Sequence, residues 1–213
     1  MVTTGDKTST SPEREPPGTH PLAQNALNLP NIITVSRLLL AFVLFAMISF
    51  EASWIASAVV FLLAAATDAL DGHIARRYGM VTALGRILDP FVDKIIICGA
   101  FIFLLEKQPG SGVNAWMVVA VVGREMFVTG LRSFLEQMGK DFSASLSGKI
   151  KMAMQCVAVT LSLLSLDSAW RDSGLFLMTR DVILWSTVAV TLYSGFIYVQ
   201  RAIVLLRPPK RSA

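Results

Sequence analysis

The chain has 213 residues, of which 54% are hydrophobic and only 16% are charged, and its mean hydropathy is +0.58. Soluble domains usually carry about 25% charged residues, so this composition argues against a soluble globular protein and for a membrane protein. The formal net charge is only +4, and the distribution of the basic residues is more informative than their sum.

The first 20 residues are rich in Thr, Ser, Pro, Glu and Gly, and we expect them to form a disordered cytoplasmic tail. Six apolar segments follow, and each approaches or exceeds the roughly 20 residues that a helix needs to cross a bilayer. Helices are expected because an open chain in lipid must satisfy its own backbone hydrogen bonds. The sequence predicts an all-α membrane protein with transmembrane helices at 32–50, 54–77, 82–106, 114–138, 146–166 and 181–206.

Basic residues are distributed unevenly between the two sides of this predicted bundle. If the N-terminus is cytoplasmic, the external loops carry Lys107, Arg171 and Arg180, and the other 16 of the 19 basic residues lie in helices or on the cytoplasmic side. Cytoplasmic loops are enriched in Lys and Arg, so both termini are predicted to be cytoplasmic. The expected organisation is a six-helix domain over 21–207, followed by a basic cytoplasmic tail at 208–213.

Four carboxylates lie within 26 residues where the second predicted helix ends and the third begins. Asp68 and Asp71 are three residues apart, so they share one face of the second helix. Asp89 and Asp93 are four apart and share one face of the third. Acids in apolar surroundings are costly unless they are paired or hydrated. Two such helices side by side would gather oxygen ligands suited to Mg²⁺ or Mn²⁺.

Small residues accompany the acids. Gly72 lies within a predicted helix, where Gly costs roughly 1 kcal/mol relative to Ala, and close approach of a ligand or metal would explain its presence. Ala75 and Gly85 would likewise leave room for a flat ring. Helix–helix packing through small residues is the alternative explanation.

A second group of functional candidates is basic. Arg124 and Arg132 lie two turns apart in the fourth predicted helix, and Lys149 and Lys151 open the fifth. A phosphorylated substrate would use Arg as a bidentate donor and Lys as a point charge. For the lysines the alternative is cytoplasmic anchoring of the helix. For Arg124 it is an ion pair with a nearby acid such as Glu125.

The acidic segment has the pattern D-x2-D-G-x2-A-R-x8-G-x3-D-x3-D, which resembles the motif of the CDP-alcohol phosphotransferase family. Three further segments resemble the phosphatidylglycerophosphate synthases of that family. They are residues 28–37, Gly123-Arg124-Glu125 with Arg132, and Gly148-Lys149-Ile150-Lys151 with Gln155. The resemblance extends from about residue 28 to the last predicted membrane segment.

The resemblance implies roles for these residues. Asp68, Asp71 and Asp89 would ligate metal, two ions being expected, and Asp93 would be the general base as well as a candidate ligand. The cations Arg124, Arg132, Lys149 and Lys151 would bind the acceptor's phosphate. The nucleotide would be held by Thr34, Arg37, Asp68, Gly72, Ala75, Arg76 and Gly85. For Arg37 an interfacial, snorkelling arginine is the alternative.

The predicted reaction joins CDP-diacylglycerol to sn-glycerol 3-phosphate and yields phosphatidylglycerol phosphate and CMP. The expected location is the bacterial inner membrane, with the active site at the cytoplasmic face among membrane lipids. Resemblance also implies a homodimer, and no nucleic-acid partner is expected.

Three other functions remain open at this point. A sister enzyme could use inositol phosphate, serine or phosphatidylglycerol as the acceptor. An intramembrane prenyltransferase also uses Asp-rich helices and Mg²⁺, although its acids usually form two separate motifs. A divalent-cation transporter would place its acids near the bilayer midplane, whereas these are predicted near the cytoplasmic surface.

Overall fold

The structure is a computed structural model that describes the backbone of residues 29–78, 83–139 and 146–206, with side chains described for 32–67, 91–139 and 148–206. All regular structure in these residues is α-helical, which confirms the predicted all-α class. The helices are α1 (Leu29–Ser49), α2 (Trp54–Tyr78), α3 (Ala83–Glu106), α4 (Ala115–Gln137), α5 (Leu146–Leu164) and α6 (Gly174–Leu206).

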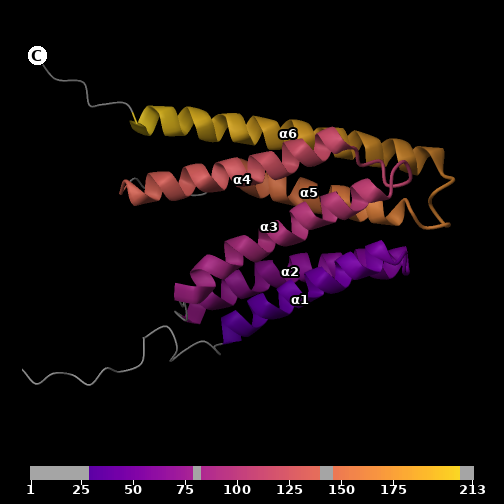
Figure 1. Ribbon diagram of the computed structural model, residues 1–213, viewed down its shortest axis with the longest axis horizontal. Coiled ribbons are helices and arrows are strands. Elements are labelled where there is room, and N and C mark those ends of the chain that lie inside the picture. The colour runs from indigo at the N-terminus through magenta and orange to yellow at the C-terminus, as the bar shows by residue number, and fades with distance from the viewer. Residues whose placement is uncertain (1–28, 79–82, 140–145, 207–213) are drawn as a thin grey trace, which may run out of the picture.

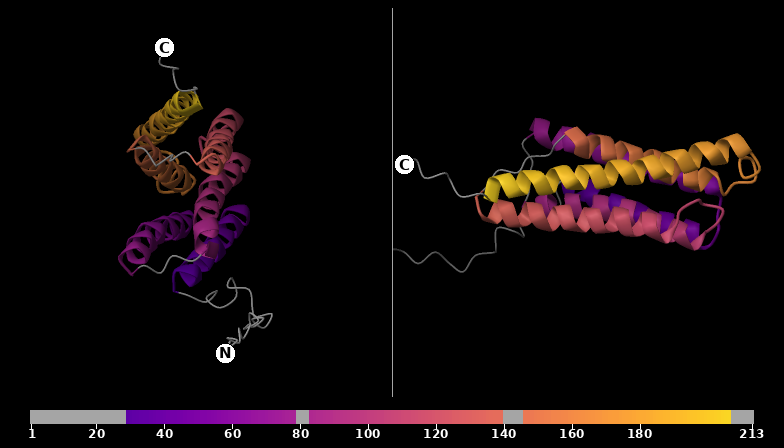
Figure 2. Two further views of the ribbon diagram at one scale, coloured as in Figure 1. Left: turned by 90° about the vertical axis from the view of Figure 1, so that its left-hand side faces the viewer. Right: turned by 90° about the horizontal axis from the view of Figure 1, so that it is seen from above.

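The helices form two groups of three that are joined along part of their length. Helices α1, α2 and α3 contact one another, and α6 contacts both α4 and α5. Contacts of α2 with α5, and of α3 with α4 and α5, connect the groups. The groups diverge toward the end at which α2 ends and α3 begins, as Figures 1 and 2 show. Because successive helices alternate in direction, this end also holds the end of α4, the start of α5 and the end of α6.

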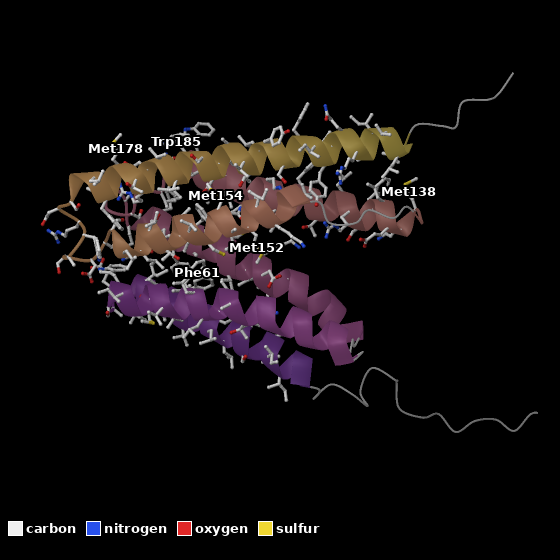
Figure 3. All side chains as sticks on the ribbon, turned by 180° about the vertical axis from the view of Figure 1, so that it is seen from behind. Phe61, Met138, Met152, Met154, Met178 and Trp185 are labelled. Carbon is white, nitrogen blue, oxygen red and sulfur yellow. The ribbon has the colours of Figure 1, made fainter. Side chains whose placement is uncertain are left out.

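An apolar core connects the two groups. It includes Phe61 of α2, Phe101 of α3 and Leu163 of α5, all with no exposed surface. Phe61 lies between α2 and α5 in Figure 3. By contrast, Met178 and Trp185 on α6 point away from the neighbouring helices (Figure 3) and are 67% and 56% exposed. Apolar side chains therefore both fill the interior and cover the outer surface, as expected for helices surrounded by lipid.

Helix α6 begins earlier than predicted, at Gly174 and not at residue 181. Arg180 was predicted to lie in the external loop before this helix, but it is only 6% exposed and lies within the helix. Its guanidinium donates to the carbonyl of Gly110 at 2.6 Å and pairs with Asp181 at 2.7 Å. These partners satisfy the buried charge, which allows the helix to continue through it.

Among the residues that the structure describes, two helices are long and apolar enough to cross a membrane by length and composition, at Ile32–Ser49 and Gly174–Leu206. The stretch Trp54–Thr67 is apolar but shorter. These spans are consistent with a membrane protein, while the six crossings and the cytoplasmic termini stay predictions. The predicted tails, 1–20 and 208–213, lie outside the described residues, and the domain limits also stay predictions.

Candidate active site

The acidic motif lies on two helices that contact each other. Asp68 and Asp71 belong to α2, and Asp89 and Asp93 belong to α3. The helical backbone thus gives each pair the shared face that its spacing predicts. The side chains of the first three acids lie outside the described residues, as do those of the predicted nucleotide residues Gly72, Ala75, Arg76 and Gly85.

Asp93 is the one member of the motif whose side chain is described. Its Oδ1 accepts a hydrogen bond from Nη1 of Arg37 at 2.7 Å, which joins α3 to α1. The Arg37 side chain has no exposed surface, whereas that of Asp93 is 29% exposed. The burial of Arg37 excludes the interfacial, snorkelling alternative. A charge-assisted hydrogen bond of this kind holds the carboxylate in one orientation.

Thr34 lies one helical turn before Arg37 and is only 1% exposed. The two predicted nucleotide residues of α1 therefore face the interior from the same side of the helix. Arg37 contacts the acidic motif directly through Asp93. The first helix is thus positioned to contribute polar groups beside the motif, as the resemblance implied, and nucleotide contact itself stays a prediction.

One basic candidate of α4 and one of α5 meet at the same buried carboxylate. Glu125 is 8% exposed, and its Oε1 accepts hydrogen bonds from Nη1 of Arg124 at 3.3 Å and from Nζ of Lys151. The ion pair between Arg124 and Glu125 that the sequence left open is therefore present. Lys151 is only 7% exposed. Its contact shows that the α5 lysine reaches the same α4 glutamate that Arg124 contacts.

The two lysines of α5 have different surroundings. Lys151 is buried in the cluster, whereas Lys149 is exposed at the start of the helix. Residues two apart on a helix point in different directions, so only one of them can face the same partners. The contacts that define the cluster include Lys151 and not Lys149, which favours the anchoring alternative for Lys149.

Helix α6 contributes two polar residues that the sequence did not indicate. Oγ of Ser194 accepts from Nη2 of Arg124 at 2.7 Å, and the hydroxyl of Tyr198 accepts from Nη2 of Arg132 at 3.4 Å. Arg132 thereby lies beside Arg124 in the same cluster. Ser194 and Tyr198 are common in apolar helices, and no spacing rule shows which of them faces another helix. Only the α4–α6 contact identifies them.

Lys94 connects the acidic and basic groups and was also missed. It follows Asp93 on α3, is partly buried, and interacts electrostatically with Glu125, Asp93 and Arg132. The sequence signal was its position directly after the last motif acid. Its interactions place the α3 end of the acidic motif next to the cation cluster of α4 and α5.

The donor set of the motif fits a hard divalent cation, because carboxylate oxygens are the ligands that Mg²⁺ and Mn²⁺ prefer. Among the described side chains, no three His, Cys, Asp or Glu residues form a metal-binding group. Three of the four predicted ligands lie outside those side chains, so the predicted metal site is not tested by this result.

Comparison with known proteins identifies the family of the chain. Residues 27–193 match the family described as CDP-alcohol phosphatidyltransferase. The chain is 34% identical over 188 residues to the CDP-diacylglycerol–glycerol-3-phosphate 3-phosphatidyltransferase of Bacillus subtilis (strain 168), covering 82% of this chain and 94% of the relative. It is also 34% identical over 173 residues to the protein of the same name from Rickettsia bellii (strain RML369-C), covering 80% and 93%. The chain belongs to the CDP-alcohol phosphatidyltransferase family.

Proposed function

We propose that the protein transfers the phosphatidyl group of CDP-diacylglycerol to sn-glycerol 3-phosphate, giving phosphatidylglycerol phosphate and CMP. The relatives described above carry the name of this reaction. The observation that carries the proposal is the buried cation cluster next to Asp93, since a phosphorylated acceptor needs such a site and a neutral polyol does not. Family membership sets aside the prenyltransferase and the cation transporter.

The charge balance of the cluster supports a phosphate ligand. Arg124 and Lys151 share the carboxylate of Glu125, Arg132 contacts Tyr198 beside them, and Lys94 adds a further cation from α3. Buried charges are costly unless they are compensated. A phosphomonoester dianion would balance this excess and accept the hydrogen bonds that guanidinium groups donate. Inositol phosphate has the same charge, so the choice of glycerol 3-phosphate rests on the relatives.

In this proposal the acidic motif binds metal and nucleotide. Asp68, Asp71 and Asp89 would hold the divalent cation, two ions being the number we propose, with Asp93 as a further candidate ligand. The family is generally dependent on divalent metal. When bound, the metal neutralises the pyrophosphate and orients it for displacement. The nucleotide would lie against Thr34, Arg37, Gly72, Ala75, Arg76 and Gly85.

The transfer itself needs a proton acceptor beside the acceptor hydroxyl. Asp93 takes the proton as the hydroxyl oxygen forms its bond to the phosphatidyl phosphorus, and the bond from that phosphorus to the CMP oxygen breaks. Arg37 holds the Asp93 carboxylate in place during this step. The cations of α4 and α5 bind the far phosphate of the acceptor, so its hydroxyl is directed toward α3.

We also propose the topology predicted from sequence. Six membrane crossings with both termini cytoplasmic would place the acidic motif at the cytoplasmic face of the bacterial inner membrane, where nucleotide and metal are available. The domain would cover residues 21–207, flanked by the tails 1–20 and 208–213. A homodimer is proposed from family resemblance.

An acceptor panel tests the proposed reaction. Purified protein in detergent is supplied with CDP-diacylglycerol, Mg²⁺ and one of glycerol 3-phosphate, inositol phosphate, serine or phosphatidylglycerol, and the lipid product is identified. We expect phosphatidylglycerol phosphate with glycerol 3-phosphate and little product otherwise. Efficient transfer to a different acceptor, with none to glycerol 3-phosphate, would assign the protein to a sister reaction.

A further inference from the structure

The face of α6 that packs on α4 carries two buried polar residues one helical turn apart. Ser194 has no exposed surface and Tyr198 is 2% exposed. Each accepts a hydrogen bond from a different arginine of α4, at 2.7 Å from Arg124 to Ser194 and at 3.4 Å from Arg132 to Tyr198. One turn of α6 therefore contacts both guanidinium groups of the basic cluster.

The ring of Tyr198 contacts both guanidinium groups as well. The Cζ atom of Arg124 lies 5.4 Å from the ring centroid, and that of Arg132 lies 6.0 Å from it. A cation within about 6 Å of an aromatic centroid is attracted by the electron-rich face of the ring. Two like charges at one ring repel each other, so this arrangement is best compensated by an anion bound between or beside them.

Glycines allow these close approaches. A Cβ atom at Gly195 would lie 3.3 Å from Cγ of Arg124, closer than most such contacts. A Cβ atom at Gly148 of α5 would lie 3.5 Å from the Tyr198 hydroxyl, which is an ordinary van der Waals distance, so the close approach depends on Gly195. The absence of a side chain at Gly195 lets the stem of Arg124 lie directly against α6, next to Ser194.

The arginines also retain unused donors. Within the described part of the chain, the Nε atoms of Arg124 and Arg132 are buried and have no hydrogen-bond partner. A buried charged donor that is left without an acceptor is destabilising. Two such donors in one cluster indicate that a ligand with several acceptor oxygens completes the site.

We infer that Tyr198, together with Ser194, is a positioning residue that orients the guanidinium groups of Arg124 and Arg132 for the phosphate of the acceptor. The inference rests on the proposed function, since it assigns that phosphate to this cluster. The tyrosine ring fixes the two cations from one side, and the two hydroxyls fix their Nη2 atoms. The acceptor thus meets a preorganised pair of donors.

The test is a series of variants assayed for CMP release in detergent, with KM measured separately for glycerol 3-phosphate and for CDP-diacylglycerol. Tyr198→Phe keeps the ring and removes one weak hydrogen bond, so we expect the KM for glycerol 3-phosphate to rise about twofold to threefold. Tyr198→Leu also removes both cation–π contacts, and the expected rise is about tenfold to thirtyfold. Ser194→Ala should raise it about fivefold. The KM for CDP-diacylglycerol should change by less than about twofold in each variant.

Tyr193 is the matched control, because it lies on the same helix and is 65% exposed. Tyr193→Phe and Tyr193→Leu should leave both KM values unchanged, and thermal unfolding in detergent should show that each variant is folded. If Tyr198→Leu does not fold, Tyr198→Phe and Ser194→Ala decide the question.

Two results would overturn the inference. One is an unchanged KM for glycerol 3-phosphate in the folded variants, and the other is an equal rise of both KM values. The wild-type measurement is separate: absence of transfer to glycerol 3-phosphate would refute the proposed function, whatever the variants do.

Discussion

Asp93 combines two features that a general base requires, a fixed orientation and access to the site. Its carboxylate is held by buried Arg37 and is 29% exposed. A well-oriented acceptor hydroxyl suits a base that is held in this way, since orientation contributes much of the rate.

Substitution of Asp93 by Asn tests this role. Asn keeps the size of the side chain and can still accept the hydrogen bond from Arg37, but it cannot take a proton at neutral pH. We expect turnover to fall by about 10²–10⁴-fold, with CDP-diacylglycerol binding largely retained. CMP release and Mg²⁺-dependent substrate binding are measured on the same preparation. Loss of binding as complete as in Asp68→Asn would instead make Asp93 a metal ligand.

The two lysines of α5 show where residue-level prediction from sequence ends. Both were expected in the acceptor site because both are cations at the start of the fifth predicted helix, and of the two Lys151 contacts Glu125. Charge and position along the chain predicted the cluster. The helical rotation between the two residues decides which one enters it, and that depends on how α5 packs against α2, α3 and α6.

A pair of methionine substitutions measures this difference, since Met keeps most of the apolar stem of a lysine and removes its charge. Lys151→Met should raise the KM for glycerol 3-phosphate about tenfold or more, the usual effect of losing a charge-assisted contact. Lys149→Met should change it by less than about twofold, because exposed charges contribute little. Equal effects of the two substitutions would contradict the assignment.

At the scale of the elements, the sequence predicted the helices well because long apolar segments can only be helical in lipid. Five of the six predicted helix starts lie within three residues of the observed ones. The largest of these five differences is at α1, which was predicted to start at residue 32 and starts at Leu29. The exception is α6, because the sequence shows the charge of Arg180 but does not show the groups that bind it. Arg180 is satisfied by Gly110 and Ser165, which lie far away in the chain and are invisible to a local pattern.

Gly112 makes the contact around Arg180 possible, and its substitution tests the importance of this contact. Gly112 has φ +73°, and an added Cβ would lie 2.5 Å from Nε of Arg180. Gly112→Ala should therefore destabilise the protein by about 1–3 kcal/mol, measured by thermal unfolding in detergent. Gly174→Ala is the control, because nothing lies within 4 Å of its added Cβ. A variant Gly112→Ala as stable as this control would show that the α3–α4 connection adapts easily.

The whole molecule brings together two chemically different groups that lie apart in the sequence. The acidic motif occupies α2 and α3, the cation cluster occupies α4, α5 and α6, and Lys94 interacts with both. The sequence indicated the acidic motif because its spacing is specific. It did not indicate the polar residues that α6 adds to the cation cluster, because these depend on which helices pack together.

Metal removal tests the acidic half of this arrangement. Without a cation, the motif carboxylates would repel one another and the pyrophosphate of the substrate. EDTA should abolish CMP release, and excess Mg²⁺ or Mn²⁺ should restore it, while Ca²⁺ should restore less because it prefers larger and more flexible coordination. Full activity after exhaustive chelation would contradict metal-assisted transfer.

The orientation in the membrane is the prediction on which the location of the active site depends. It can be tested with single cysteines in a background in which Cys98 and Cys156 are replaced by Ala. Ser173→Cys lies on an exposed position between α5 and α6, on the predicted external side, and Ser212→Cys lies in the predicted cytoplasmic tail. A membrane-impermeant maleimide should label residue 173 in intact cells and residue 212 only after permeabilisation, because Lys and Arg are retained on the cytoplasmic side. The opposite labelling pattern would place the acidic motif outside the cell, away from its nucleotide substrate, and would refute the proposed topology.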